Sequence, residues 1–112
     1  MDLVFKETSI FTTQVKALLS DDEYKSFQEL LLGRPDVGPV IRDTGGCRKI
    51  RWAANNNGGK SGGIRVIYYW IKNDNQIFLL LAYEKSKQDN LTAKQKAVLK
   101  HLVKNELQTE ES

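Results

Sequence analysis

CRKIRWAA (residues 47–54) and IRVIYYWI (residues 64–71) are two strand-like runs, and an Asn- and Gly-rich loop joins them. Side chains alternate between the two faces of a strand, so residues two apart share a face. Lys49 and Arg51 therefore lie side by side on one face of the first run. Arg65 lies near the start of the second run, which is otherwise apolar enough for a central strand. Cations held on a rigid sheet beside a Gly-rich loop are suited to a phosphodiester ligand.

Turn signals and apolar runs predict two further strands. The segment 73–75 (Asn-Asp-Asn) is a turn signal, and residues 76–83 after it are nearly all apolar. This strand should therefore form a hairpin with the run at 64–71. A short opening strand is predicted at residues 3–6. Both faces of the run at 64–71 are apolar, which indicates that each is covered along part of its length.

Three helices are predicted from apolar stripes and capping residues. Thr8 or Ser9 can cap the first, and Ser20 to Glu23 and Thr92 to Gln95 have the spacing of capping boxes for the other two. Gly33 followed by Pro35 should end the second helix. The three apolar stripes are Phe11, Val15, Leu18 and Leu19; Tyr24, Phe27, Leu30 and Leu31; and Val98, Leu99, Leu102 and Val103.

The predicted element order is β-α-α-β-β-β-α, which places the chain in the α+β class. We expect a small antiparallel sheet, an N-terminal helical hairpin and a C-terminal helix, with the helices packed on one face of the sheet. The length of 112 residues suits a single domain over 1–112. Residues from about 107 to 112 are expected to form a polar, acidic tail.

The positive charge is concentrated in the middle of the chain. Residues 44–73 contain six basic residues and no acidic one, whereas residues 1–34 contain six acidic and four basic residues. This distribution favours a polyanionic partner. The alternative, that the basic strands only protect a solvated face or edge of the sheet, remains open at this point.

Several classes of chemistry are disfavoured by the residues present. The chain has one cysteine, Cys47, and one histidine, His101, far apart in the sequence, so neither a catalytic thiol nor a metal site is predicted. No cofactor is expected. No run approaches the ~18 apolar residues needed to span a membrane, and the N-terminus does not resemble a signal peptide. A reducing cytoplasm fits these features.

The remaining chemistry is that of lysine and arginine on phosphate. Arginine can clamp a phosphate through two hydrogen bonds and stabilise the charge that develops in an in-line displacement. RNA brings its own nucleophile, the 2′-hydroxyl. Arg65 should be half-buried and needs a partner, either an anionic ligand or a carboxylate such as Asp43 or Glu84. Nearby tyrosines and tryptophans can stack on bases, although core packing is the expected role of most.

Together with the element order, TGG (residues 44–46), RKIR (48–51) and GGIRVIYY (62–69) resemble the RelE/HigB family of type II toxin–antitoxin ribonucleases, and HigB toxins in particular. The resemblance implies a RelE-like fold. It also implies an mRNA interferase that enters the ribosomal A site and cleaves translated mRNA by 2′-hydroxyl attack on the adjacent phosphate, without a metal. Such toxins stop growth until a cognate antitoxin neutralises them.

The resemblance also implies which residues carry the reaction. The candidate catalytic residues are Lys49, Arg51, Arg65, Lys85 and Tyr83, and the candidate RNA- or ribosome-binding residues are Arg48, Lys60 and Lys87. Either Lys85 or Lys87 can match the basic residue of the turn. Arg51 stands where relatives often have lysine, and arginine is a poor general base. The proton acceptor is therefore Lys49, Tyr83 or a ribosomal group.

The expected partners are the ribosome, mRNA and a HigA-like, helix-turn-helix antitoxin, and promoter DNA would be bound only through the antitoxin complex. No membrane partner is expected. Two other functions are compatible with the same architecture. One is a ParE-like gyrase poison, which the paired basic strand argues against, and the other is a non-catalytic module that binds RNA or the ribosome.

Overall fold

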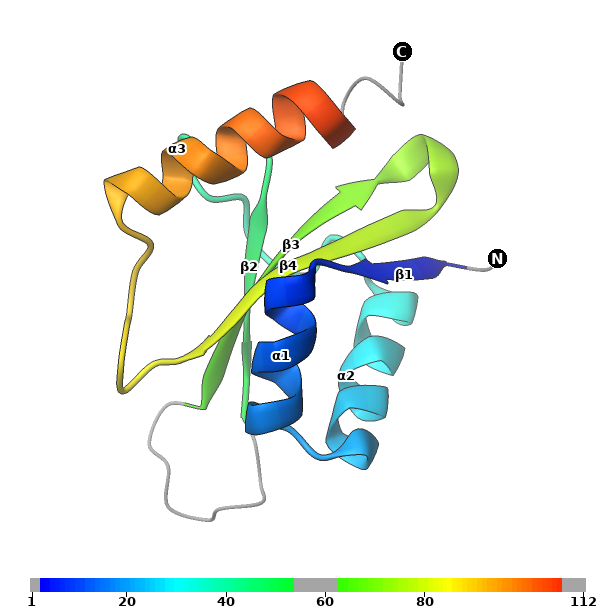
Figure 1. Cartoon of the computed structure of the whole chain (residues 1–112). Helices are drawn as coiled ribbons and strands as arrows, with labels where there is room; N and C mark the ends of the chain where they lie inside the picture. Colours follow the sequence, from blue (N-terminus) through cyan, green and yellow to red (C-terminus); the bar gives the residue numbers. More distant parts are fainter. Residues whose placement is uncertain (1–2, 54–62, 108–112) are drawn as a thin grey trace.

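The computed structural model describes residues 3–53 and 63–107 as seven principal elements in the predicted order. The strands are β1 (Val4–Glu7), β2 (Arg48–Trp52), β3 (Ile64–Ile71) and β4 (Gln76–Glu84); the helices are α1 (Ser9–Leu18), α2 (Asp21–Gly33) and α3 (Ala93–Leu102). A short 3-10 turn links β3 to β4, and a π-helical turn extends α3. Figure 1 shows α1 and α2 as a hairpin beside the sheet and α3 across its other end.

The sheet is mixed, so the prediction of an antiparallel sheet was wrong in one strand pair. The strand order is β1-β4-β3-β2, with β2, β3 and β4 antiparallel to their neighbours and β1 parallel to β4. Tight turns impose antiparallel pairing on the last three strands. β1 is connected to β2 through the helical hairpin rather than through a turn, and this long connection leaves its direction free.

The helices cover both faces of the sheet, which corrects the prediction that they pack on one. One core lies between the sheet and the helical hairpin, and the other lies between the sheet and α3. We call them the hairpin core and the α3 core. Buried side chains that alternate along β3 contribute Val66 and Tyr68 to the first, and Ile67 and Tyr69 to the second. A strand that is apolar on both faces needs a cover on each.

The helix starts follow the predicted caps. Thr8 caps α1, and Ser20 with Glu23 and Thr92 with Gln95 form complete capping boxes. Two expectations near the C-terminus were wrong. Val98 is 61% exposed rather than in the core, and Leu107, placed in the polar tail, is buried in the α3 core. Residues 108–112 of that tail lie outside the described residues.

An irregularity in the β3–β4 pairing brings two successive leucines to one face. The register shifts between Ile67 and Tyr68, so that Leu80 has no direct partner on β3. Leu80 and Leu81 consequently both pack on the α3 core. Beyond the end of β1, side chains of the first helical segment bond the outer edge of β4: Thr8 Oγ1 donates to Leu80 O (2.9 Å) and Ala82 N donates to Gln14 Oε1 (2.8 Å).

Candidate functional site

Three of the predicted site residues form a row across the sheet. Arg51 on β2 pairs with Arg65 on β3, and Arg65 pairs with Tyr83 on β4. Lys49 lies one step along, opposite Ile67. All four side chains belong to the face that carries the α3 core, at the end of the sheet where β3 begins. The site is therefore the continuation of a core surface on which polar residues replace apolar ones.

Arg65 is almost completely buried. Its side chain is 2% exposed, Nη1 lies 3.5 Å from Ile64 O, and Nη2 lies 3.8 Å from Asp89 Oδ1. The structure thus places a carboxylate against the guanidinium, and it is not one of the two considered from the sequence. Asp89 was missed because it lies in the polar connection after β4, where sequence alone does not say which side chain turns inward.

Tyr83 completes the row beside these two charges. Burial raises the pKa of its phenol above the ordinary value, and Asp89 adds to the rise while Arg65 opposes it. The hydroxyl is buried and makes no hydrogen bond with the described residues. A buried hydroxyl without a partner is uncommon in folded proteins. Tyr83 therefore stays protonated near neutral pH and can donate its proton to a ligand.

The segment between β4 and α3 lies against the basic residues. Asn90 Oδ1 is 3.5 Å from Lys49 Nζ, and Asp89 contacts Arg65 as described. Gln88 Nε2 donates to Gln95 Oε1 (2.6 Å) and to Asn90 O (3.0 Å), which ties this segment to the first turn of α3. We call residues 88–90 the site loop. Through the site loop, the carboxylate of Asp89 lies near Arg65 and the amide oxygen of Asn90 lies near Lys49.

The base of the β2–β3 hairpin depends on a glycine. Gly63 has φ of +62°, and a Cβ there would lie 2.3 Å from Trp52 O, far inside the van der Waals limit. Its carbonyl accepts a hydrogen bond from Lys85 N (3.2 Å). This contact joins the start of β3 to the end of β4 next to Arg65.

The other predicted residues do not join the row. Arg48 faces the opposite side of β2, and its Nη1 donates to the carbonyls of Asp36 (3.0 Å) and Gly38 (2.8 Å). Lys85 and Lys87 are exposed, and Lys87 Nζ lies 3.3 Å from Glu84 Oε2. Lys60 lies outside the described residues. Whether these residues bind RNA or the ribosome stays a prediction.

Within residues 3–53 and 63–107 no three His, Cys, Asp or Glu side chains gather as a metal site would require. Cys47 is fully buried, and burial raises the pKa of its thiol to about 11. In the same part of the chain no helix is long and apolar enough to cross a membrane.

A protein-family model described as the RelE toxin of the RelE/RelB toxin–antitoxin system matches residues 4–112. The chain belongs to the RelE toxin family. Two solved structures are similar to this RelE-family chain in fold. One, a mutant of E. coli toxin RelE in the free state, has 15% sequence identity and a TM-score of 0.56, and the match covers 80% of this chain and 90% of that one. The other, the intact E. coli RelBE toxin–antitoxin complex, has 17% identity and a TM-score of 0.55, and the match covers 74% of this chain and 96% of that one.

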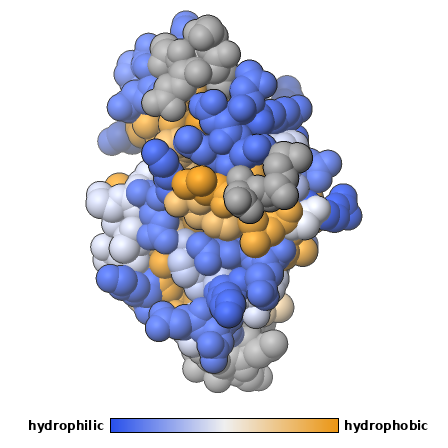
Figure 2. Space-filling model, turned by 90° about the vertical axis from the view of Figure 1, so that its right-hand side faces the viewer, coloured by the Kyte–Doolittle hydropathy of each residue, from blue (hydrophilic) through white to orange (hydrophobic). Residues whose placement is uncertain are grey.

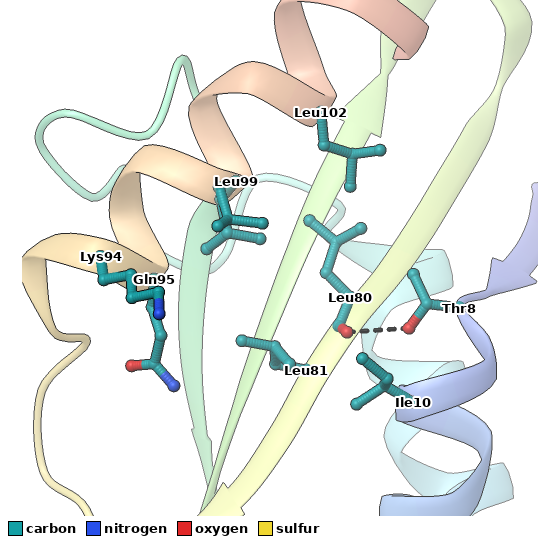
Figure 3. Close-up of a pocket in the computed structure, with 9 residues that line it drawn as sticks. Thr8, Ile10, Leu80, Leu81, Lys94, Gln95, Leu99 and Leu102 are labelled. Carbon is teal, nitrogen blue, oxygen red and sulfur yellow. Dashed lines mark hydrogen bonds between the residues drawn. The ribbon is translucent and has the colours of Figure 1, made fainter.

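This RelE-family chain also has an apolar groove that the sequence did not predict. It has a volume of about 340 Å³ and lies between α3, β4 and the start of α1 (Figure 3). Ile10 and Val98 stand at its sides, 58% and 61% exposed. In the close-up, Leu80, Leu81, Leu99 and Leu102 point into the space between the elements. Val98 belongs to the predicted apolar stripe of α3, but no element within residues 3–53 and 63–107 covers it.

A space-filling view shows apolar side chains gathered on one face of the surface (Figure 2). On the face seen in Figure 2 they form a patch at mid-height, with hydrophilic residues above and below. Contiguous apolar surface of this kind is typical of protein–protein contact sites.

Proposed function

We propose that this toxin is a ribosome-dependent endoribonuclease, an mRNA interferase that cleaves translated mRNA in the ribosomal A site of the cytoplasm. The observation that carries the proposal is the row of Arg51, Arg65 and Tyr83, with Lys49 beside it. Three cations and a protonated phenol converge at one end of the sheet, on the face that α3 leaves uncovered at that end. Membership of the RelE toxin family supports this function, and the motifs quoted above favour a HigB-like member.

The proposed reaction is a transesterification within the RNA. The 2′-oxygen attacks the adjacent phosphorus, the bond from phosphorus to the 5′-oxygen breaks, and the products are a 2′,3′-cyclic phosphate and a 5′-hydroxyl. Arg65, Arg51 and Lys49 stabilise the charge that develops on the phosphate oxygens. Side chains, the RNA and the ribosome supply every group of this scheme, so it requires no metal.

Proton transfer is divided between different groups. Tyr83, protonated at neutral pH, suits the role of donor to the departing 5′-oxygen and does not suit that of acceptor. Arg51 remains cationic. The proton of the 2′-hydroxyl is therefore assigned to a group of the ribosome, because Lys49 serves as a cation in the same scheme. Lys85, Lys87, Lys60 and Arg48 are assigned to contacts with RNA or ribosome.

The cognate antitoxin is proposed to place an amphipathic helix in the groove between α3 and β4. The lining is apolar, and Lys94 at its side would favour an acidic partner. A helix fits better than an added strand, because Thr8 and Gln14 already bond the outer edge of β4. We assign this helix to a HigA-like protein with a helix-turn-helix, through which the complex would bind promoter DNA.

The proposal is tested by inducing the chain without its antitoxin and mapping new 5′ ends on an abundant mRNA by primer extension. Cleavage should require translation, and Arg65→Ala should reduce it by roughly 10²- to 10³-fold, the scale of losing one charge-stabilising group. Arg34→Ala is the matched control, because Arg34 is an exposed arginine at the end of α2. Growth arrest with intact mRNA would replace this function with a gyrase-type or ribosome-binding poison.

A further inference from the structure

The proposed function requires Arg65 to touch a phosphate, yet its side chain is 2% exposed. A bidentate clamp needs open access to the edge of the guanidinium. The Nη2 atom of that guanidinium has Asp89 Oδ1 3.8 Å away. The structure therefore presents the site in a closed state, in which a carboxylate oxygen stands near the position that a phosphate oxygen would take.

We propose that the site loop is an autoinhibitory latch in which Asp89 occupies the phosphate position on Arg65 and must leave before RNA can bind. The inference rests on the proposed function. Asn90 acts in the same way on Lys49, since its Oδ1 lies 3.5 Å from Nζ. Two neighbouring residues thus present oxygen atoms to two of the phosphate-binding cations, as an RNA backbone would.

The contacts of the latch are long, which makes them easy to replace. A distance of 3.8 Å is within range of an ion pair but beyond that of a hydrogen bond. A phosphate on Arg65 would instead form two charge-assisted hydrogen bonds of about 2.8 Å. Asp89 is also 60% exposed, so most of its surface is already hydrated and little is lost when it swings into solvent.

The ends of the loop are held more firmly than its tip. Gln88 bonds Gln95 on α3 at 2.6 Å, and Leu91 is 8% exposed in the α3 core. Asp89 and Asn90 between them are exposed. Breaking the two latch contacts therefore requires movement of Asp89 and Asn90 and leaves α3 in place. RNA aligned by the ribosome can displace the tip, whereas free RNA must compete with it.

The latch is tested by measuring the Kd of a short RNA with a 2′-deoxy nucleotide at each position, which cannot be cleaved, by fluorescence anisotropy. Asp89→Asn should bind about two- to five-fold more tightly than the wild type, the range expected for releasing one exposed ion pair. Asn90→Ala should strengthen binding less, because it removes a neutral contact. Cleavage of free RNA by Asp89→Asn should rise in parallel.

Asp74→Asn is the matched control, because it removes one negative charge from an exposed carboxylate in the turn between β3 and β4, at the other end of these strands from Arg65. Measurements at about 50 mM and about 200 mM salt separate two effects of the substitution: release of Arg65 from Asp89, and the loss of long-range repulsion between a carboxylate and RNA, which salt screens. Unchanged or weaker binding by Asp89→Asn, or an equal gain in Asp74→Asn, would overturn the latch. If the wild type cleaves translated mRNA in that case, the proposed function survives; if it neither binds nor cleaves RNA, both fail.

Discussion

The two faces of the sheet use the same strands for different purposes. On the face under α1 and α2, β3 contributes Ile64, Val66 and Tyr68 to a continuous apolar core. On the other face, Ile67 and Tyr69 continue the α3 core, but Arg65 takes the next position, where α3 no longer covers the sheet. Side-chain alternation therefore lets one strand serve stability on one side and phosphate chemistry on the other.

The difference between the faces shows that burying Arg65 costs free energy, whereas burying its apolar neighbours gains it. Apolar side chains gain free energy when they leave water, about 25 cal/mol per Å². A guanidinium loses hydration and must recover it from partners such as Asp89. The hairpin face is thus determined by folding alone, whereas the site face keeps a buried charge that folding by itself does not explain.

The largest effect is expected for Phe27→Ala, which should lower stability on the hairpin face without changing the site face. Phe27 is fully buried and packs edge-on against Trp52, with ring centroids 5.5 Å apart. Loss of the ring should lower the free energy of unfolding by about 3–5 kcal/mol, measured by urea denaturation. Cleavage per folded molecule should stay the same, because the ring lies on the hairpin face. Ile10→Ala, at an exposed position, is the control; a cleavage defect that exceeds the unfolded fraction would show that the two faces are coupled.

A smaller effect is expected from removing the hydroxyl of Tyr68, which is buried on the hairpin face, or of Tyr83, which is half-buried on the site face. Tyr68 Oη donates to Pro35 O (2.8 Å) and accepts from Gly38 N (3.0 Å), so Tyr68→Phe should cost about 1 kcal/mol of stability and leave cleavage unchanged. Tyr83→Phe should leave stability nearly unchanged and slow cleavage, because it removes the proposed donor. Thermal melts and single-turnover cleavage of translated mRNA measure the pair. Equal effects of both variants on either quantity would contradict the assignment.

The smallest effect is a dependence of stability on alkaline pH. Burial raises the pKa of Tyr68 and Tyr83 above 10.0 in the folded chain. The folded state then holds these protons more tightly than the unfolded state, so the free energy of unfolding is independent of both groups below about pH 10 and falls above it. Denaturation at a series of pH values measures this fall, and comparison with Tyr68→Phe and Tyr83→Phe gives the part that each tyrosine contributes. A free energy of unfolding that instead rises with pH as the tyrosines titrate, and does not rise in these variants, would show that the pKa shifts have the opposite sign.

Local patterns predicted much of the fold. The capping boxes at Ser20 and Thr92 fixed the starts of α2 and α3, because their hydrogen bonds involve residues only three apart. Alternation placed Lys49 and Arg51 on one face of β2, and the register of β2 on β3 added Arg65 to that face. The errors concern long-range placement. The direction of β1, the face chosen by α3 and the exposure of Val98 depend on which surfaces meet, and helical spacing does not contain that information.

The sequence by itself determined the element order, the shared face of Lys49 and Arg51 and the RelE-like character of the central strands, since these follow from spacing along one chain. Only the tertiary structure decided that Tyr83 completes a row with Arg65, that Asp89 lies within ion-pair distance of the Arg65 guanidinium and that a groove lies beside α3. These features join residues that are distant in sequence or lie in an irregular loop. Their positions depend on the register of the strands and the path of the connection after β4, which no local pattern specifies.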